Sequence, residues 1–147
     1  MLKVSAADIG LFLLRLTLGG IFVGHGVLKL FPENGGIDGF AGYLSSIGVP
    51  GPAYPMAIAA VATEVGGGAL LILGIFPRLA GAGLAVTMLV AILFVHWKNG
   101  FFMARSATEG GGVANGFEYA LALFTMSLHI LLAGGGKLSL LRAKGKS

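Results

Sequence analysis

Six ionisable side chains lie within, or at the edges of, apolar stretches of this sequence, and their types suit proton transfer and anion binding. They are Arg15, His25, Lys29, Glu64, His96 and Glu118. Carboxylates and histidines exchange protons, and lysine and arginine stabilise anions. Ionisable groups in an apolar environment are costly and usually face a protein interior or a water-filled cavity. The sequence therefore predicts one polar pocket enclosed by the elements that carry these residues.

Glu64 is the most informative of the six because it lies near the middle of the apolar run Ala53–Phe76. In a helix it stands roughly 17 Å from either end of that run, farther than a carboxylate side chain reaches. Its charge must then be paired, or its carboxyl group protonated. The expected partner is Arg15 or His25, and both a structural ion pair and a functional acid satisfy this requirement. The same helical face carries small residues that let helices approach closely, namely Ala57, Ala60, Gly67 and Gly68.

The first apolar run places its polar residues on one face. At about 100° per residue, Arg15, His25 and Lys29 fall within an arc of roughly 80° on a helix. Lys29 lies near the end of the run, where it either lines the pocket or extends its side chain to the membrane surface. His25 is too short to reach that surface, so it either lines the pocket or serves as a structural hydrogen-bonding group.

Two further residues are expected at the outer rim of the pocket. His96 ends the third apolar run beside Trp97, and an interfacial role fits it as well as a place in the pocket. Glu118 begins the fourth run and lies on one helical stripe with His129. The predicted pocket thus has Glu64 as its floor and His25, Lys29, His96 and Glu118 as its wall and rim. The three histidines lack a paired spacing such as H-x₃-H, so we predict no metal site.

The composition indicates that these elements lie in a membrane. The chain has 147 residues, of which 56% are hydrophobic and 11% charged, and a mean hydropathy of +0.90. Each of four apolar runs approaches the length of about 20 residues that a helix needs to span a bilayer. They are approximately 9–31, 53–76, 78–97 and 116–133. We predict an all-α integral membrane protein, a single domain over residues 1–147 that forms a bundle of four transmembrane helices.

The two loops expected on the outer side carry structure of their own. In the first, Ile37, Phe40, Leu44 and Ile47 recur at helical spacing, and Gly48 ends the pattern. This predicts a short amphipathic helix at the interface, either as a cap over the bundle mouth or as a passive spacer. In the second loop, the apolar segment 101–103 suits a dip into the interface, and the glycines at 110–112 suit a flexible turn.

The positive charges predict the orientation of the chain. The formal net charge is +4, and the inner side of a four-span chain would hold Lys3, Arg78, Lys137, Arg142, Lys144 and Lys146. By the positive-inside rule, both termini are cytoplasmic and the protein is a multi-pass protein of the inner membrane of a prokaryotic-type cell. The basic C-terminal tail is expected to meet anionic lipid headgroups rather than nucleic acid.

Two absences narrow the chemistry further. The chain contains no cysteine, which argues against disulfides, iron–sulfur clusters and thiolate-bound zinc. The N-terminal apolar run is too long for a cleaved signal peptide, contains Arg15, and has no small-residue cleavage site after it.

The order of several segments resembles the DoxX family of small four-helix membrane proteins. The matching segments are "LRLTLGGIFVGHGVLKL" (Leu14–Leu30), "TEVGGGALLILGIFPRLAG" (Thr63–Gly81), "HWKNGFF" (His96–Phe102), "GFEYALALF" (Gly116–Phe124) and "GGGKLSL" (Gly134–Leu140). The resemblance implies a link to quinone-reducing thiosulfate oxidation and to membrane oxidoreductase complexes. It maps recurrent polar positions onto Arg15, Lys29, Glu64, Arg78, His96 and Glu118. The family's C-terminal pattern GPG-x-x-S-x-D differs here, with Gly135 in place of the proline and Leu141 in place of the aspartate.

Two functions fit these observations. In the first, the protein is a quinone-associated redox subunit whose pocket binds a quinone headgroup, while no cofactor is carried by the chain itself. In the second, it is a non-catalytic accessory subunit that stabilises a larger respiratory or redox complex through other membrane subunits. A transporter is a third reading, although no clear internal repeat or broken helix supports it. The sequence does not decide whether the protein is an enzyme, nor its oligomeric state.

Overall fold

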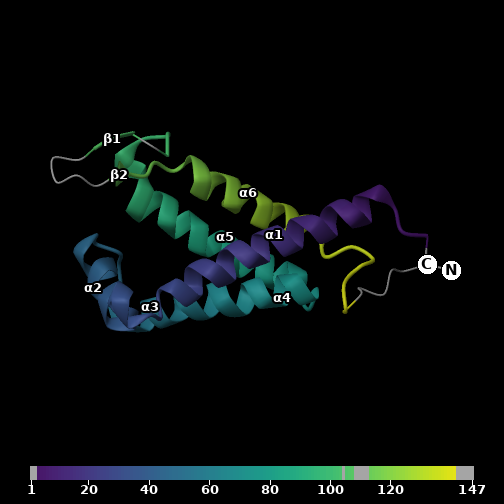
Figure 1. Cartoon of the computed structure of the whole chain (residues 1–147), viewed down its shortest axis with the longest axis horizontal. Helices are drawn as coiled ribbons and strands as arrows, with labels where there is room; N and C mark the ends of the chain where they lie inside the picture. Colours follow the sequence, from purple (N-terminus) through teal and green to yellow (C-terminus); the bar gives the residue numbers. More distant parts are fainter. Residues whose placement is uncertain (1–2, 104, 108–112, 142–147) are drawn as a thin grey trace.

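The computed structural model of the protein describes residues 3–103, 105–107 and 113–141 and is mainly helical (Figure 1). Its helices are α1 (Ala6–Leu28), α2 (Gly36–Ser46), α3 (Ala53–Ala62), α4 (Gly68–Leu73), α5 (Pro77–Val90) and α6 (Glu118–Ala133). Two π-helical segments, Thr63–Gly67 and Ala91–His96, join α3 to α4 and extend α5. Short 3₁₀ turns cover Pro32–Asn34 and Trp97–Asn99, and an antiparallel ribbon pairs β1 (Arg105–Ala107) with β2 (Val113–Ala114).

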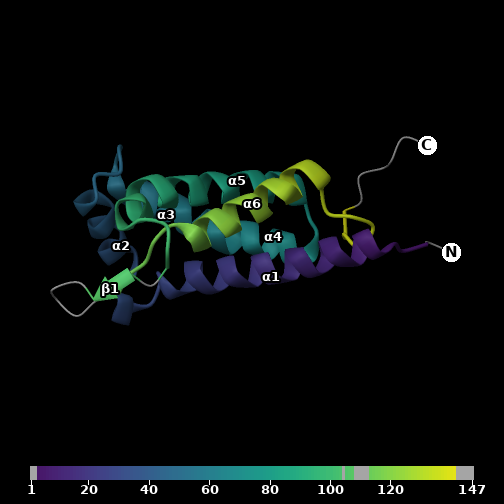
Figure 2. The ribbon, with the colours of Figure 1, turned by 90° about the horizontal axis from the view of Figure 1, so that it is seen from above.

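These helical segments join into four continuous helical rods, the last of which is α6. Three of the rods are long and apolar enough to cross a membrane, by length and composition. They are Ala6–Leu28, Ala53–Leu73 and Pro77–Asn99. The fourth rod, α6, is also apolar but has only 16 residues. Figures 1 and 2 show the four rods packed along one another. The helical, multi-pass architecture is thus confirmed, and the number of four spans stays a prediction.

The first rod begins earlier than its apolar pattern predicts because a polar cap starts it. The Ser5 side chain accepts a hydrogen bond from the backbone N–H of Asp8, and the Asp8 carboxylate accepts one from the backbone N–H of Ser5. This reciprocal capping box satisfies donors that the first turn would otherwise leave unpaired. The helix therefore starts at Ala6 and ends at Leu28, which leaves Lys29 at its C-cap.

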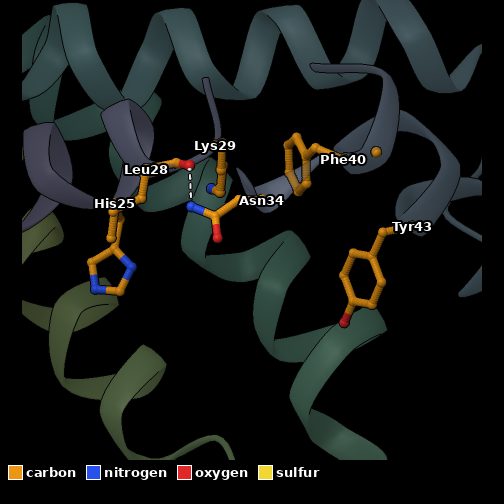
Figure 3. Close-up of a pocket in the computed structure, with 7 residues that line it drawn as sticks. His25, Leu28, Lys29, Asn34, Phe40 and Tyr43 are labelled. Carbon is orange, nitrogen blue, oxygen red and sulfur yellow. Dashed lines mark hydrogen bonds between the residues drawn. The ribbon is translucent and has the colours of Figure 1, made fainter. Parts of the chain in front are cut away.

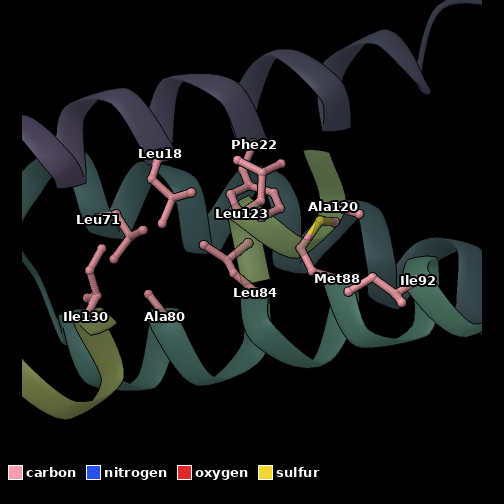
Figure 4. Close-up of a cluster of buried hydrophobic side chains, with 10 residues drawn as sticks. All are labelled: Leu18, Phe22, Leu71, Ala80, Leu84, Met88, Ile92, Ala120, Leu123 and Ile130. Atoms are coloured by element: carbon pink, nitrogen blue, oxygen red, sulfur yellow. The ribbon is translucent and has the colours of Figure 1, made fainter. Parts of the chain in front are cut away.

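A continuous apolar core joins all four rods (Figure 4). Its buried members are Leu18, Phe22, Leu71, Ala80, Leu84, Met88, Ile92, Ala120, Leu123 and Ile130. Leu18, Leu71, Leu84 and Ile130 have no exposed surface at all. These four residues come from α1, α4, α5 and α6, so a dry layer crosses the whole bundle at the level where they meet.

Glycines bring the helix backbones into direct contact near this layer. A methyl group at Gly19 of α1 would lie 2.6 Å from the carbonyl oxygen of Gly68 in α4, and one at Gly81 of α5 would lie 2.9 Å from that of Ser127 in α6. Small residues commonly allow such close crossings in lipid. Both Gly67 and Gly68 are buried, in agreement with the predicted inward face of Glu64.

The two ends of the bundle differ. The start of α1, the segment after α6 and the turn between α4 and α5 lie at one end, whereas α2 and the β1–β2 ribbon lie at the other (Figures 1 and 2). We call these the terminal end and the α2 end. After α6 the chain folds back onto the terminal end, where the N–H groups of Leu140 and Leu141 donate to the carbonyls of Leu73 and Gly74.

The α2 end confirms one loop prediction and adds an unpredicted element. The amphipathic helix is present as α2, and its apolar residues Ala41 and Leu44 are buried in a small cluster with Ala57 of α3. The ribbon was not predicted. Phe101, Phe102 and Met103 are exposed on the protein surface, as a dip into the interface requires. The predicted glycine turn at 110–112 lies outside the described residues.

The glycine contacts yield a prediction with a matched control. We expect Gly19→Ala to lower the free energy of unfolding by about 1–3 kcal/mol, because the added methyl group would overlap backbone atoms of α4. Gly20→Ala, at the adjacent position with open space around it, should leave stability unchanged or slightly raised. Thermal unfolding of both variants in detergent measures the difference, and equal stabilities would show that the α1–α4 crossing is not close.

Candidate functional site

Glu64 is held by Lys29, which reaches inward from the end of α1. The lysine ammonium lies 2.5 Å from each carboxylate oxygen, and the side chain of Glu64 is 4% exposed against 26% for Lys29. The expectation that Glu64 must be paired or protonated is consistent with this contact. The expected partner was wrong, because neither Arg15 nor His25 bonds to Glu64, and Lys29 turns inward instead of extending to the membrane surface.

The local sequence of α1 makes this pairing reachable. Gly26 lies one helical turn before Lys29 on the same face, and a methyl group there would lie 3.0 Å from the Cβ atom of Glu64 and closer still to Val65. Without a side chain at this position, the end of α1 can pack directly against the segment that carries Glu64. The Lys29 side chain is then long enough for its ammonium group to reach the Glu64 carboxylate.

Glu64 also lies in an irregular part of its helix. The π-helical segment Thr63–Gly67 interrupts the α-helical hydrogen bonding in the middle of the second rod. A second π-helical segment, Ala91–His96, ends the third rod at His96. Single-turn π segments are rare and often occur at functional sites. Both segments contribute residues to the same cavity.

That cavity is large, mostly apolar and polar at one place. It has a volume of about 930 Å³ and is lined by residues of α1, α2, α3, α5 and α6. Apolar side chains such as Phe22, Leu44, Met56 and Leu123 make up most of its wall. Its ionisable wall residues are His25, Lys29, Glu64 and His96. A cavity of this size with few convergent polar groups has the character of a small-molecule site.

A second, smaller recess adjoins the cavity at the α2 end (Figure 3). It has a volume of about 350 Å³ and is lined by His25, Leu28, Lys29, Asn34, Gly39, Phe40 and Tyr43. His25, Lys29, Phe40 and Tyr43 line both spaces. Because the Lys29 ammonium lies 4.6 Å from the centre of the Phe40 ring, α2 contributes an aromatic partner to the lysine. Of the two predicted roles for this helix, its position fits the cap over the bundle mouth.

The two histidines have neutral neighbours. Nδ1 of His96 lies 2.9 Å from the carbonyl oxygen of Asn115, which fixes the ring beside the loop that enters α6. The His25 ring lies 6.4 Å from the ring of Tyr119, centre to centre. Within the described part of the chain, His, Asp and Glu form no cluster of three that could hold a metal ion.

Arg15 lies outside the cavity, at the terminal end. It is 1% exposed, and its guanidinium donates to the carbonyl oxygens of Leu71, Gly135 and Leu138 and to the hydroxyl of Ser139. Arg15 therefore fastens the C-terminal segment to the bundle, and its predicted place in the pocket is not what the structure shows. The serine of the C-terminal pattern has a clear role here as its partner.

Glu118 does not line the cavity either. Its carboxylate accepts a hydrogen bond of 2.7 Å from the backbone N–H of Met103 and so ties the start of α6 to the preceding loop. His129, on the same stripe of α6, is exposed on the bundle surface. The structure thus brings four of the six predicted residues together and places Arg15 and Glu118 in local structural contacts.

The fold and this site define a multi-pass α-helical membrane protein with a polar-ended internal cavity. The chain belongs to the DoxX family, whose model matches residues 10–97 and so includes Lys29, Glu64 and His96. It is 35% identical to "Putative oxidoreductase CatD" of Bacillus subtilis (strain 168) over 133 residues, which cover 90% of this chain and 85% of that protein. An uncharacterized protein of Haemophilus influenzae is 30% identical over 127 residues, 86% of this chain and 84% of that protein. No solved structure matches the chain.

The ion pair predicts an asymmetric response to substitution. Lys29→Met leaves the buried Glu64 charge without a partner and should cost about 3–5 kcal/mol of stability. Glu64→Leu should cost less, because the freed lysine can turn toward the adjoining recess. The double variant Lys29→Met/Glu64→Leu should recover most of the lost stability, because replacing a buried ion pair by apolar groups often leaves the free energy of unfolding unchanged.

Unfolding of the three variants in detergent, with His25→Ala as a control for a neighbouring residue, completes a double-mutant cycle. Additive single effects would contradict the pairing.

Proposed function

We propose that this protein binds the headgroup of a membrane quinone at Lys29 and Glu64 and serves membrane-bound oxidoreduction. The single observation that carries the proposal is the position of this ion pair in the wall of a mostly apolar cavity of about 930 Å³. A quinone has the matching form, with a polar ring and an apolar tail. When bound, it supplies two-electron redox chemistry that no side chain of this protein provides.

The residues of the chain supply binding and proton transfer. The Lys29 ammonium has three donors, of which a carbonyl oxygen of the headgroup can take one and retain the bond when that oxygen gains negative charge. The Glu64 carboxylate, held by the Lys29 ammonium 2.5 Å away, can accept a proton from a hydroxyl group of the bound headgroup. The burial of Glu64 lowers the local dielectric and strengthens both interactions.

Similarity supports the redox part of the proposal. The name of the Bacillus subtilis relative, CatD, contains the word oxidoreductase, and the relative matches most of this chain. Since the chain has no cysteine, electrons would reach the headgroup from a partner protein or a second substrate.

We also propose that α6 forms a fourth span and that both termini are cytoplasmic in the inner membrane. At 1.5 Å per residue, 16 residues measure about 24 Å, and the aromatic residues at its α2 end extend the apolar length. Lys3, Arg78 and Lys137 belong to segments of the terminal end, and Arg142, Lys144 and Lys146 follow them in the sequence, whereas the loops of the α2 end hold Lys98 and Arg105.

An accessory role in a larger complex is the second candidate. Gly20 and Gly24 form a G-x-x-x-G spacing on the outward face of α1, and neither has any atom within 4 Å of where its side chain would begin. This spacing suits close packing by a transmembrane helix of another subunit. Such a subunit would also be a source of electrons, so the two candidate functions are compatible.

The quinone proposal predicts a loss of binding on removal of one charge. A short-chain ubiquinone should bind the purified protein, and Glu64→Gln should keep the fold but weaken that binding by about tenfold or more. Asp38→Asn, which neutralises an exposed acid of α2 outside the cavity, is the matched control and should bind normally.

Binding is measured by tryptophan quenching or by equilibrium dialysis in detergent. Unaltered affinity in Glu64→Gln would sink the assignment of this residue. A stoichiometric partner with its own cofactors and no quinone in the purified protein would favour the accessory role.

The orientation predicts one-sided labelling. Because the natural chain has no cysteine, Lys3→Cys and Ser45→Cys report the terminal end and the α2 end without background. A membrane-impermeant maleimide added to intact cells should label Ser45→Cys only, and inverted vesicles should show the reverse. Labelling of Lys3→Cys in intact cells would overturn the cytoplasmic assignment of the termini.

A further inference from the structure

We infer that the Lys29–Glu64 pair communicates with water at the α2 end of the bundle alone, so that a proton exchanged at this pair enters and leaves on that side. The inference rests on the proposed function for its meaning, since it gives the site a direction of proton exchange. The geometry itself is independent of which headgroup binds.

The open side is defined by the recess beneath α2. Glu64 is almost fully buried, whereas Lys29 is 26% exposed and lines both the cavity and the recess. The recess is edged by the polar groups of His25, Asn34 and Tyr43, and Asn34 is tied to the end of α1 through the carbonyl of Leu28. Figure 3 shows these side chains among those that line the recess together with Lys29. The lysine therefore connects the buried acid to a polar surface, one side chain away.

The closed side begins with the dry layer below the cavity. Leu18, Leu71, Leu84 and Ile130 are fully buried and come from four different rods. The polar side chain nearest to this layer in α6 is Ser127, and its hydroxyl donates to the carbonyl of Leu123 within its own helix. The backbone contacts at Gly19 with Gly68 and at Gly81 with Ser127 draw the rods together at this level. The fully buried apolar side chains of this layer offer a chain of water molecules few polar partners.

The contacts of Arg15 form a second barrier to water at the terminal end. Its donors bind three backbone carbonyls and the Ser139 hydroxyl, which draws the segment after α6 over the end of the bundle. Asp8 adds a bond of 2.9 Å from the backbone N–H of Lys137 in the same segment. An arginine keeps its proton in proteins, so this buried group cannot relay protons as a histidine or carboxylate would.

The sidedness has a functional consequence. Reduction of a bound quinone by two electrons from the partner protein or second substrate would take two protons from the α2 end. The reverse reaction, which returns the two electrons to that partner, would release the two protons on the same side. In the orientation proposed above, that side is the outer one. The apolar tail of the ligand is free to lie in the cavity without opening the terminal end.

Single-cysteine accessibility tests the inference on the full chain. Thr63→Cys and Ala60→Cys each place a thiol in the cavity wall next to Glu64, and either serves if the other fails to fold. The probe is a charged, membrane-impermeant methanethiosulfonate, applied to intact cells and to inverted vesicles. Ser45→Cys and Lys3→Cys identify the α2 side and the terminal side, whatever the absolute orientation.

We expect both cavity thiols to react with probe added from the side that labels Ser45→Cys. Neither should react with probe added from the side that labels Lys3→Cys. Reaction from the Lys3 side, or from neither side, would overturn the inference. Quinone binding by the unlabelled protein is measured separately. Labelling from the Ser45 side alone without quinone binding would leave the inference in place and remove the proposed ligand. Quinone binding together with labelling from the Lys3 side would support the ligand and overturn the inference.

Discussion

The burial of one carboxylate governs the arrangement of this protein. Glu64 lies in the middle of an apolar rod, where an isolated charge would be prohibitive. Lys29 compensates it from the end of α1, and Gly26 lets that helix come close enough for the two side chains to meet. The pair stands in the wall of the cavity and gives this mostly apolar space a buried ion pair. Every functional inference drawn for the cavity depends on this pairing.

The bundle separates its structural and functional halves along its length. At the terminal end, glycine contacts, a dry layer and the Arg15 bonds hold the rods and the C-terminal segment together. Toward the α2 end, two π-helical segments and a covering amphipathic helix contribute residues to the wall of the cavity. A binding site supported by well-packed helices is held in a fixed geometry.

The helices and the burial of Glu64 in an apolar helix could be predicted from the sequence. The residues with which the charged side chains pair could not. Periodicity placed Arg15, His25 and Lys29 on one face of α1, but it carries no information about which of them meets Glu64. Arg15 instead binds carbonyls of a non-helical segment 120 residues away, a contact that no spacing reveals. The residue types Ser5 and Asp8 are typical of a capping box and could have predicted the start of α1 at Ala6. The apolar run alone predicts a start at Ile9, three residues too late.

The central claim is that Glu64 meets the ligand directly, and infrared difference spectroscopy tests it most closely. Adding a short-chain quinone to the purified protein should shift the carboxylate band of Glu64, because a new hydrogen bond alters its charge distribution. The band is assigned by its absence from Glu64→Gln and its persistence in Asp38→Asn. The account predicts a ligand-induced shift that only Glu64→Gln loses. An identical difference spectrum in Glu64→Gln would contradict it.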